Sequence, residues 1–188
     1  MMVKNQDAKG NHHYNRNHQG GNKVDTEFKP DEILVVLGHN IRTTRERNGY
    51  GLSELAAEIS YDRNCLSAAE YGEQNLEYNT VLNLSRALNV PFPTLFSRTY
   101  QNTYVNADSF TGGFIEDDYL LVFIENYQRE MKSQQLNQVE VYAAADIRPE
   151  TISRILNKKA NNPTIKTLYA MAYTVGVDMY NLFLRKTM

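Results

Sequence analysis

The feature that most constrains this fold is an internal repeat of apolar positions. In the first part of the repeat, three pairs are separated by 86 residues: Leu55 and Val141, Tyr61 and Ile147, and Leu66 and Ile152. Further along the chain, three pairs are separated by 87 residues: Leu84 and Met171, Val90 and Val177, and Phe96 and Phe183. Self-similarity at a nearly fixed offset indicates two copies of one structural unit, with one residue inserted in a loop of the second copy.

Within each copy, apolar residues recur at steps of three and four, which is the period of a helix that buries one face. The pattern predicts helices over residues 31–48, 52–59, 62–72, 81–88 and 92–96 of the first copy. In the second copy it predicts helices over 119–132 and 136–156, the latter broken at Asp146. A later helix has Asn162 as its expected N-cap and Pro163 in its first turn. The fold class is therefore all-α, with five helices in each copy.

Composition divides the chain into four segments. Residues 1–30 are rich in Asn, His, Gly and Lys and lack an apolar period, so we expect a disordered tail. Helical domains follow at 31–98 and 118–188, and a polar and aromatic linker joins them at 99–117. The tail histidines have no acidic or thiol partner at a useful spacing, so they predict no metal site. The tail could instead contact a DNA minor groove.

Charge and cysteine content limit the class of protein further. The chain has 20 Lys and Arg against 22 Asp and Glu, a formal charge of −2, so any nucleic-acid surface must be local. Cys65 is the single cysteine, which excludes an intrachain disulfide and, with the polar N-terminus, predicts a cytoplasmic protein. The longest apolar run, residues 119–124, is far shorter than the roughly 20 residues that span a bilayer. We therefore expect no membrane segment.

Each copy also carries a longer sequence pattern. The first copy has IRTTRERNGYGLSELAAEISYDRNCLSAAEYG followed by LSRALNVPFPTLF, and the second has LNQVEVYAAADIRPETISRILNKKANNPTIKTL followed by VGVDMYNLF. Over residues 34–97 and 120–184, these segments resemble the Xre/Cro-CI (lambda-repressor-like) helix-turn-helix family. The resemblance implies two tandem five-helix domains, each placing its third helix in a DNA major groove.

The resemblance also implies which side chains contact bases. These are Arg63, Asn64 and Ala68 in the first copy and Arg148, Pro149, Glu150, Ser153 and Arg154 in the second. Arginine can bond guanine bidentately and asparagine can bond adenine, whereas Ala68 and Pro149 offer only apolar contact. The two copies would therefore recognise different bases.

The phosphate contacts that the resemblance implies are unequal. In the second copy they are Asn137, Gln138, Lys158, Lys159 and Asn161. The first copy has Gly51 and Leu52 at the matching positions, followed by an acidic rim at Glu70, Glu73 and Glu77. Residues 31–99 hold six Lys and Arg against nine Asp and Glu, whereas residues 117–188 hold nine against eight. The second copy is thus expected to be the better DNA binder.

One further pair is implied by the resemblance. Arg45 and Glu70 stand where the family often has a buried ion pair between the first and third helices. The repeat offset puts Met131 and Leu156 at the same two places. Both residues of the pair thus differ between the copies. We expect this pattern because a buried charge without its partner destabilises the fold.

These features predict a sequence-specific regulator of transcription that binds double-stranded DNA, a repressor from a bacterium or a mobile element. Its two unlike domains would form an intramolecular pseudo-dimer on an asymmetric operator. Alternatively, the second domain contacts DNA while the first forms a homodimer on a palindrome. A rival prediction is a protein-interaction adaptor without DNA, for antirepression or assembly control, that uses the acidic rim as its contact surface. No catalytic motif occurs, so we expect neither an enzyme nor a cofactor.

Overall fold

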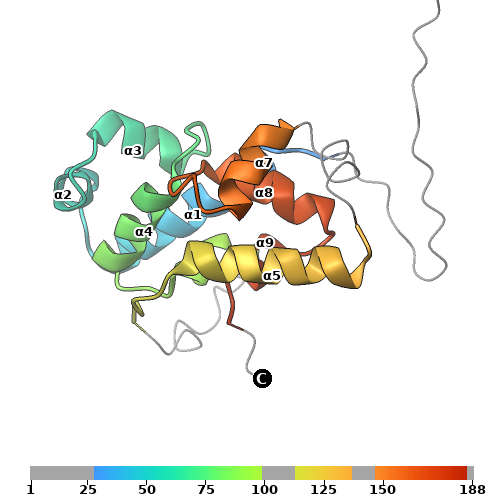
Figure 1. Cartoon of the computed structure of the whole chain (residues 1–188). Coiled ribbons are helices and arrows are strands. Elements are labelled where there is room, and N and C mark those ends of the chain that lie inside the picture. The colour runs from blue at the N-terminus through green and yellow to red at the C-terminus, as the bar shows by residue number, and fades with distance from the viewer. Residues whose placement is uncertain (1–27, 99–112, 137–146, 186–188) are drawn as a thin grey trace, which may run out of the picture.

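The computed structural model of this chain describes residues 28–98, 113–136 and 147–185, and its elements there are helical apart from one isolated β-bridge (Figure 1). The all-α prediction is confirmed for these residues. The predictions for residues 1–27, 99–112 and 137–146 lie outside them, and so do Asn137 and Gln138. No helix in the described residues has the length and apolar character needed to cross a membrane.

The N-terminal half, residues 28–98, follows the predicted helix order. Its elements are α1 (Glu32–Arg47), α2 (Leu52–Glu58), α3 (Arg63–Glu70), α4 (Tyr78–Ala87) and the 3₁₀ helix η1 (Phe92–Phe96). Ser60 makes the turn between α2 and α3 with a left-handed φ of +53°. Asp62 then caps α3 by accepting hydrogen bonds from the amides of Asn64 and Cys65.

The C-terminal half, residues 113–185, contains α5 (Tyr119–Ser133), α7 (Pro149–Leu156), α8 (Ile165–Thr174) and α9 (Met179–Leu182). The prediction that Asn162 caps α8 is wrong. Thr164 is the cap, and its hydroxyl accepts a hydrogen bond from the Thr167 amide. Residues 163–165 are instead bonded to the other half: the Tyr78 amide donates to Pro163 O, and the Ile165 amide donates to Leu76 O.

Both halves share one hydrophobic core. Phe92 and Phe96 of η1 both contact Phe183, at centroid distances of 4.9 and 5.2 Å. Tyr119, the first residue of α5, stacks on Phe92 at 4.8 Å. These rings are all buried. The two halves therefore pack against each other directly, and the linker is not their only connection.

The contacts between the halves are reciprocal at positions that the repeat makes equivalent. The isolated β-bridge pairs Glu77 with Thr164, which are 87 residues apart. Asn162 Oδ1 accepts a hydrogen bond from the Asn79 amide, and Asn75 Oδ1 accepts one from the Lys166 amide. The two hydrogen bonds are thus equivalent under the repeat, because Asn75 corresponds to Asn162 and Asn79 corresponds to Lys166. Such self-complementary contacts are typical of a two-fold symmetric interface.

The segments that precede α1 and α5 cross between the halves in the same reciprocal way. Phe28 packs on the α8 rings of Tyr169 and Tyr173, at centroid distances of 5.6 and 4.4 Å. Its repeat equivalent, Phe114, lies under the guanidinium of Arg86 on α4, at 5.3 Å. The segment before α1 thus covers part of α8, and the segment before α5 covers part of α4.

Left-handed backbone positions recur with the same offset. Gly49 and Gln135 have positive φ, as do Gly72 and Lys158, and Asn89 and Gly176. The offset is 86 residues for the first two pairs and 87 for the third. Because Asn75 and Asn162 are already 87 residues apart, the inserted residue lies between Lys158 and Asn162. In the described residues, the two halves thus turn with the same handedness at these three pairs of equivalent positions.

Candidate nucleic-acid interface

Helix α3 buries one side and exposes the other. Leu66 and Ala69 are in the core, as predicted, while Arg63 and Asn64 are exposed and Ala68 is half-buried. Arg63 Nε donates a hydrogen bond to Ser53 Oγ on α2 at 3.1 Å. Arg63 Nη1 also donates a hydrogen bond to Asn64 Oδ1 at 3.4 Å, so the two exposed side chains that are implied to contact bases are bonded to each other.

Helix α7 has the same amphipathic character. Ile152 and Ile155 are buried, which confirms the predicted core side. Arg148 is the N-cap residue and Pro149 opens the helix, where its missing N–H costs nothing. The implied base-contacting residues of this half are otherwise on the outer side: Arg148, Pro149, Glu150 and Arg154 are exposed, and Ser153 is half-buried.

The segment after α7 carries the implied phosphate contacts that the structure describes. Lys158, Lys159 and Asn161 are exposed. The chain turns sharply here, because Lys158 has a φ of +57° and the Lys159 amide donates back to Arg154 O at 2.7 Å. The turn therefore places three cationic residues, Arg154, Lys158 and Lys159, close together along the backbone at the C-terminal end of α7.

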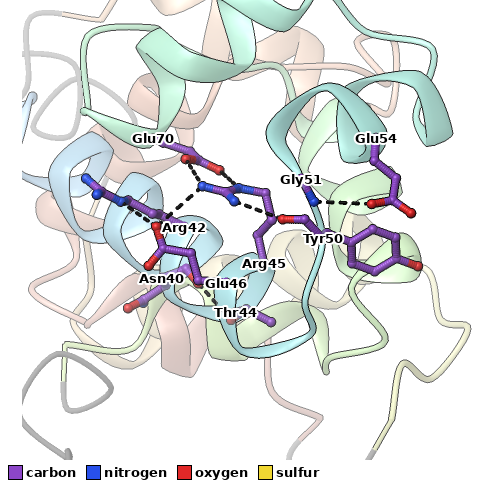
Figure 2. A network of polar contacts seen from close by, with 9 residues as sticks. All are labelled: Asn40, Arg42, Thr44, Arg45, Glu46, Tyr50, Gly51, Glu54 and Glu70. Atoms are coloured by element: carbon purple, nitrogen blue, oxygen red, sulfur yellow. Dashed lines mark hydrogen bonds and ion pairs between the residues drawn. The ribbon is translucent and has the colours of Figure 1, made fainter.

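The equivalent surface of the N-terminal half carries the opposite charge. The repeat pairs Asp62 with Arg148, and the residues that directly follow the equivalent positions Gly72 and Lys158 are Glu73 and Lys159; all four charged residues, Asp62, Arg148, Glu73 and Lys159, are exposed. At the start of α2, the Gly51 amide donates to Glu54 Oε2 at 3.2 Å (Figure 2). A carboxylate thus lies where the resemblance implies a phosphate contact, a feature that the sequence reasoning missed although Glu54 follows Gly51 by the three-residue spacing of a capping box.

Arg45 and Glu70 are brought together as a bidentate ion pair between α1 and α3 (Figure 2). Arg45 Nε and Nη2 donate to the two Glu70 carboxylate oxygens at 2.6 and 2.8 Å. Arg45 Nη1 donates to Tyr50 O at 3.0 Å, and the hydrogen bond with Glu70 raises the pKa of Arg45. This geometry fixes the C-terminal end of α3 against α1.

The ion pair corrects the predicted acidic rim. Glu70 was expected to be part of an exposed rim with Glu73 and Glu77, but its side chain is only 4% exposed. Glu77 is exposed, and it accepts a hydrogen bond from Asn162 Nδ2 across the two halves. The acidic surface of this half is therefore formed by residues near α2 and the segment after α3, and not by Glu70.

Cys65 is partly buried on α3. Its hydrogen bond with Asp62 raises the pKa of the Cys65 thiol. Because the thiolate is the reactive form, this environment does not favour a redox role for Cys65.

Comparisons with protein-family models, with curated protein sequences and with solved structures found no match.

Proposed function

We propose that this protein is a sequence-specific regulator that binds double-stranded DNA through two unlike helix-turn-helix domains held as an intramolecular pseudo-dimer. The reciprocal contacts at repeat-equivalent positions carry this proposal, because they are the contacts expected of a symmetric dimer joined into one chain. Helices α3 and α7, which both lie toward the top of Figure 1, each have an exposed side, and this supports the proposal. The family resemblance supports it as well.

The C-terminal half makes the principal DNA contacts. In this proposal Arg148 and Arg154 contact bases, and Lys158 and Lys159 contact phosphates; all four residues are exposed, in or next to one short helix. Phosphate neutralisation by such cations supplies most of the sequence-independent affinity, whereas base-edge contacts supply the specificity. The shared core of the two halves sets the spacing between α3 and α7, so the DNA site has a defined length.

The test is selection of bound sequences from a randomised duplex pool at near-physiological salt. An enriched motif with two unlike half-sites is the expected result. Arg154→Ala should relax the preference at one position at a cost of about 1–3 kcal/mol. The double variant Lys158→Ala with Lys159→Ala should weaken binding to all sequences and lower the salt slope by about 2. Lys132→Ala, at the far end of α5, is the control for loss of one positive charge.

A palindromic motif would instead mean that two chains each contribute one DNA-contacting domain. If no motif is enriched, and if affinity and salt dependence are the same in every variant, the proposal is wrong.

The alternative proposal is a protein-binding adaptor. The charge inversion at Asp62 and Glu73, together with the carboxylate of Glu54 at the start of α2, favours a surface that avoids DNA. This proposal expects no duplex affinity that depends on salt. It also expects that Glu73→Lys, which introduces the charge of Lys159, abolishes capture of the partner without affecting the fold.

A further inference from the structure

In the N-terminal half, two glycines allow α1 to pack directly against the end of α3 and the residues that follow it. We call this contact the α1–α3 seam. A Cβ atom on Gly38 would lie 2.2 Å from Ala69 O, so α1 and the end of α3 approach too closely for any side chain there. Gly72 lies against Val35, where an added Cβ would be 3.0 Å from the Val35 backbone. The Arg45–Glu70 ion pair also joins α1 to α3.

The equivalent seam in the C-terminal half carries larger residues. The repeat places Ile124 at the position of Gly38 and Lys158 at the position of Gly72, while Leu121 stands for Val35. Since the branched Ile124 prevents the close helix approach that Gly38 allows, α5 and the end of α7 cannot meet in the same way. Met131 and Leu156 replace the ion pair and are only partly buried.

A cavity of about 160 Å³ opens at this place. Leu121, Ile124 and Lys158, the equivalents of the three residues that close the first seam, all line it. Leu120 and Ala160 also line it, as do Asn161 and Tyr78 of the other half, whose hydroxyl accepts a hydrogen bond from the Leu120 amide. The cavity therefore lies where the two halves differ, at the substituted contact positions and at the segment 158–162 that contains the inserted residue, and this segment also holds the implied phosphate contacts.

We propose that this cavity binds a small anionic amphiphile, an apolar body with one carboxylate, and that its occupancy weakens DNA binding. The apolar body would lie against Leu120, Leu121 and Ile124, and the carboxylate would pair with the Lys158 ammonium and the Asn161 amide. Asp118 also lines the cavity, but its Oδ1 accepts the Leu121 amide at the start of α5, so the anion belongs at the Lys158 end. The regulatory part of this inference rests on the proposed function, because Lys158 cannot pair with the ligand and with a DNA phosphate at once.

The probe is benzoate, and its uncharged isostere benzamide is the ligand control. Binding to the full chain is measured without DNA, from amide resonances of Leu121, Lys158 and Ala160 and the methyl resonances of Ile124. We expect saturable shifts at these residues, in the millimolar range for so small a ligand, with benzamide at least about tenfold weaker. Lys158→Gln should abolish the preference for benzoate.

Lys159→Gln is the matched control, because Lys159 is the exposed neighbour that does not line the cavity. Both variants remove one cation near DNA, but only Lys158→Gln should lose benzoate. Ala160→Leu, which fills the cavity, should also prevent binding. Equal binding of benzoate and benzamide, equal losses in the two lysine variants, or no shift at the cavity would overturn the ligand site.

The regulatory effect is measured as DNA affinity of the full chain with and without saturating benzoate, by fluorescence anisotropy. We expect weaker DNA binding for the native chain and no effect of benzoate in Ala160→Leu. Benzoate binding with unchanged DNA affinity would overturn the regulation alone. A chain that binds benzoate but no duplex at any salt concentration would overturn the proposed function and leave the ligand site intact.

Discussion

Phe96 stacks on Phe183 at a centroid distance of 5.2 Å and an interplanar angle of 24°, and the two residues are repeat equivalents. An aromatic pair of this kind contributes beyond the area that it buries. Because the pair is central to the contact between the halves, it couples the folding of each half to that of the other.

Phe183→Ala should therefore destabilise the whole molecule. The ring is 1% exposed and also contacts Phe92 and Phe123, so its loss should cost about 3–5 kcal/mol. Urea unfolding followed by circular dichroism and by tyrosine fluorescence should give a single coincident transition at a lower midpoint. Leu184→Ala, at a neighbouring residue that is 36% exposed, should change stability far less. Separate transitions for the two probes would contradict the coupling.

The ion pair between Arg45 and Glu70 allows a test by exchange of residues between the halves. Arg45→Ala leaves Glu70 buried without its partner, and this should cost about 3–5 kcal/mol. Arg45→Met combined with Glu70→Leu introduces the residues of the C-terminal half, and an apolar pair of similar volume is often neutral or stabilising. The double variant should therefore be close to the native chain in urea unfolding. A double variant as unstable as Arg45→Ala would show that the helix approach at Gly38 requires the charges.

The reciprocal asparagines make a third prediction. Asn75→Ala removes the acceptor for the Lys166 amide and should cost about 1 kcal/mol, as for a lost helix cap. Asn162→Ala removes the acceptor for the Asn79 amide and also the hydrogen bond to Glu77, so it should cost more. Thermal unfolding measures both. Asn181→Ala, at an exposed position of α9, is the control and should remain within about 0.5 kcal/mol. If both interface variants match the control, these reciprocal bonds do not stabilise the interface.

Local patterns predicted the helices and their buried sides, because apolar spacing and turn residues act within a few residues. Leu66 and Ile152 were placed correctly in the core for this reason. Asn162 and Pro163 have the local pattern of a helix start, yet residues 163–165 bond to residues 76–78 of the other half, and this tertiary pairing moves the cap to Thr164.

The cavity could not be predicted in the same way, and the buried pair of Glu70 with Arg45 was implied by the family resemblance and not by the local pattern. The difference between Gly38 and Ile124 predicts a change in helix packing only when the helix that packs against each residue is known. Likewise, whether Glu70 is exposed or is buried in an ion pair depends on where Arg45 lies in space. Both features depend on pairs of residues from different helices, which apolar periodicity does not identify.

The last prediction concerns acid stability and the cap of α3. The amides of Cys65 and Asn64 donate hydrogen bonds to the Asp62 carboxylate and lower its pKa below the ordinary value of 3.8. A carboxylate with a lowered folded pKa stabilises the fold above its unfolded pKa, and this contribution is lost as the pH falls through the folded pKa. Asn is as good an N-cap as Asp but does not titrate in this range.

Asp62→Asn should thus match the native chain at pH 7 and lose less stability below about pH 4. Thermal midpoints between pH 7 and pH 3 give the comparison, and Asp62→Ala, which lacks the cap at every pH, should be less stable than both chains at pH 7. Parallel pH profiles for the native and Asp62→Asn chains would mean that the ionised cap contributes nothing to the fold. A full loss of stability in Asp62→Asn at pH 7 would instead mean that the negative charge at the start of α3 is required, and not its hydrogen bonds.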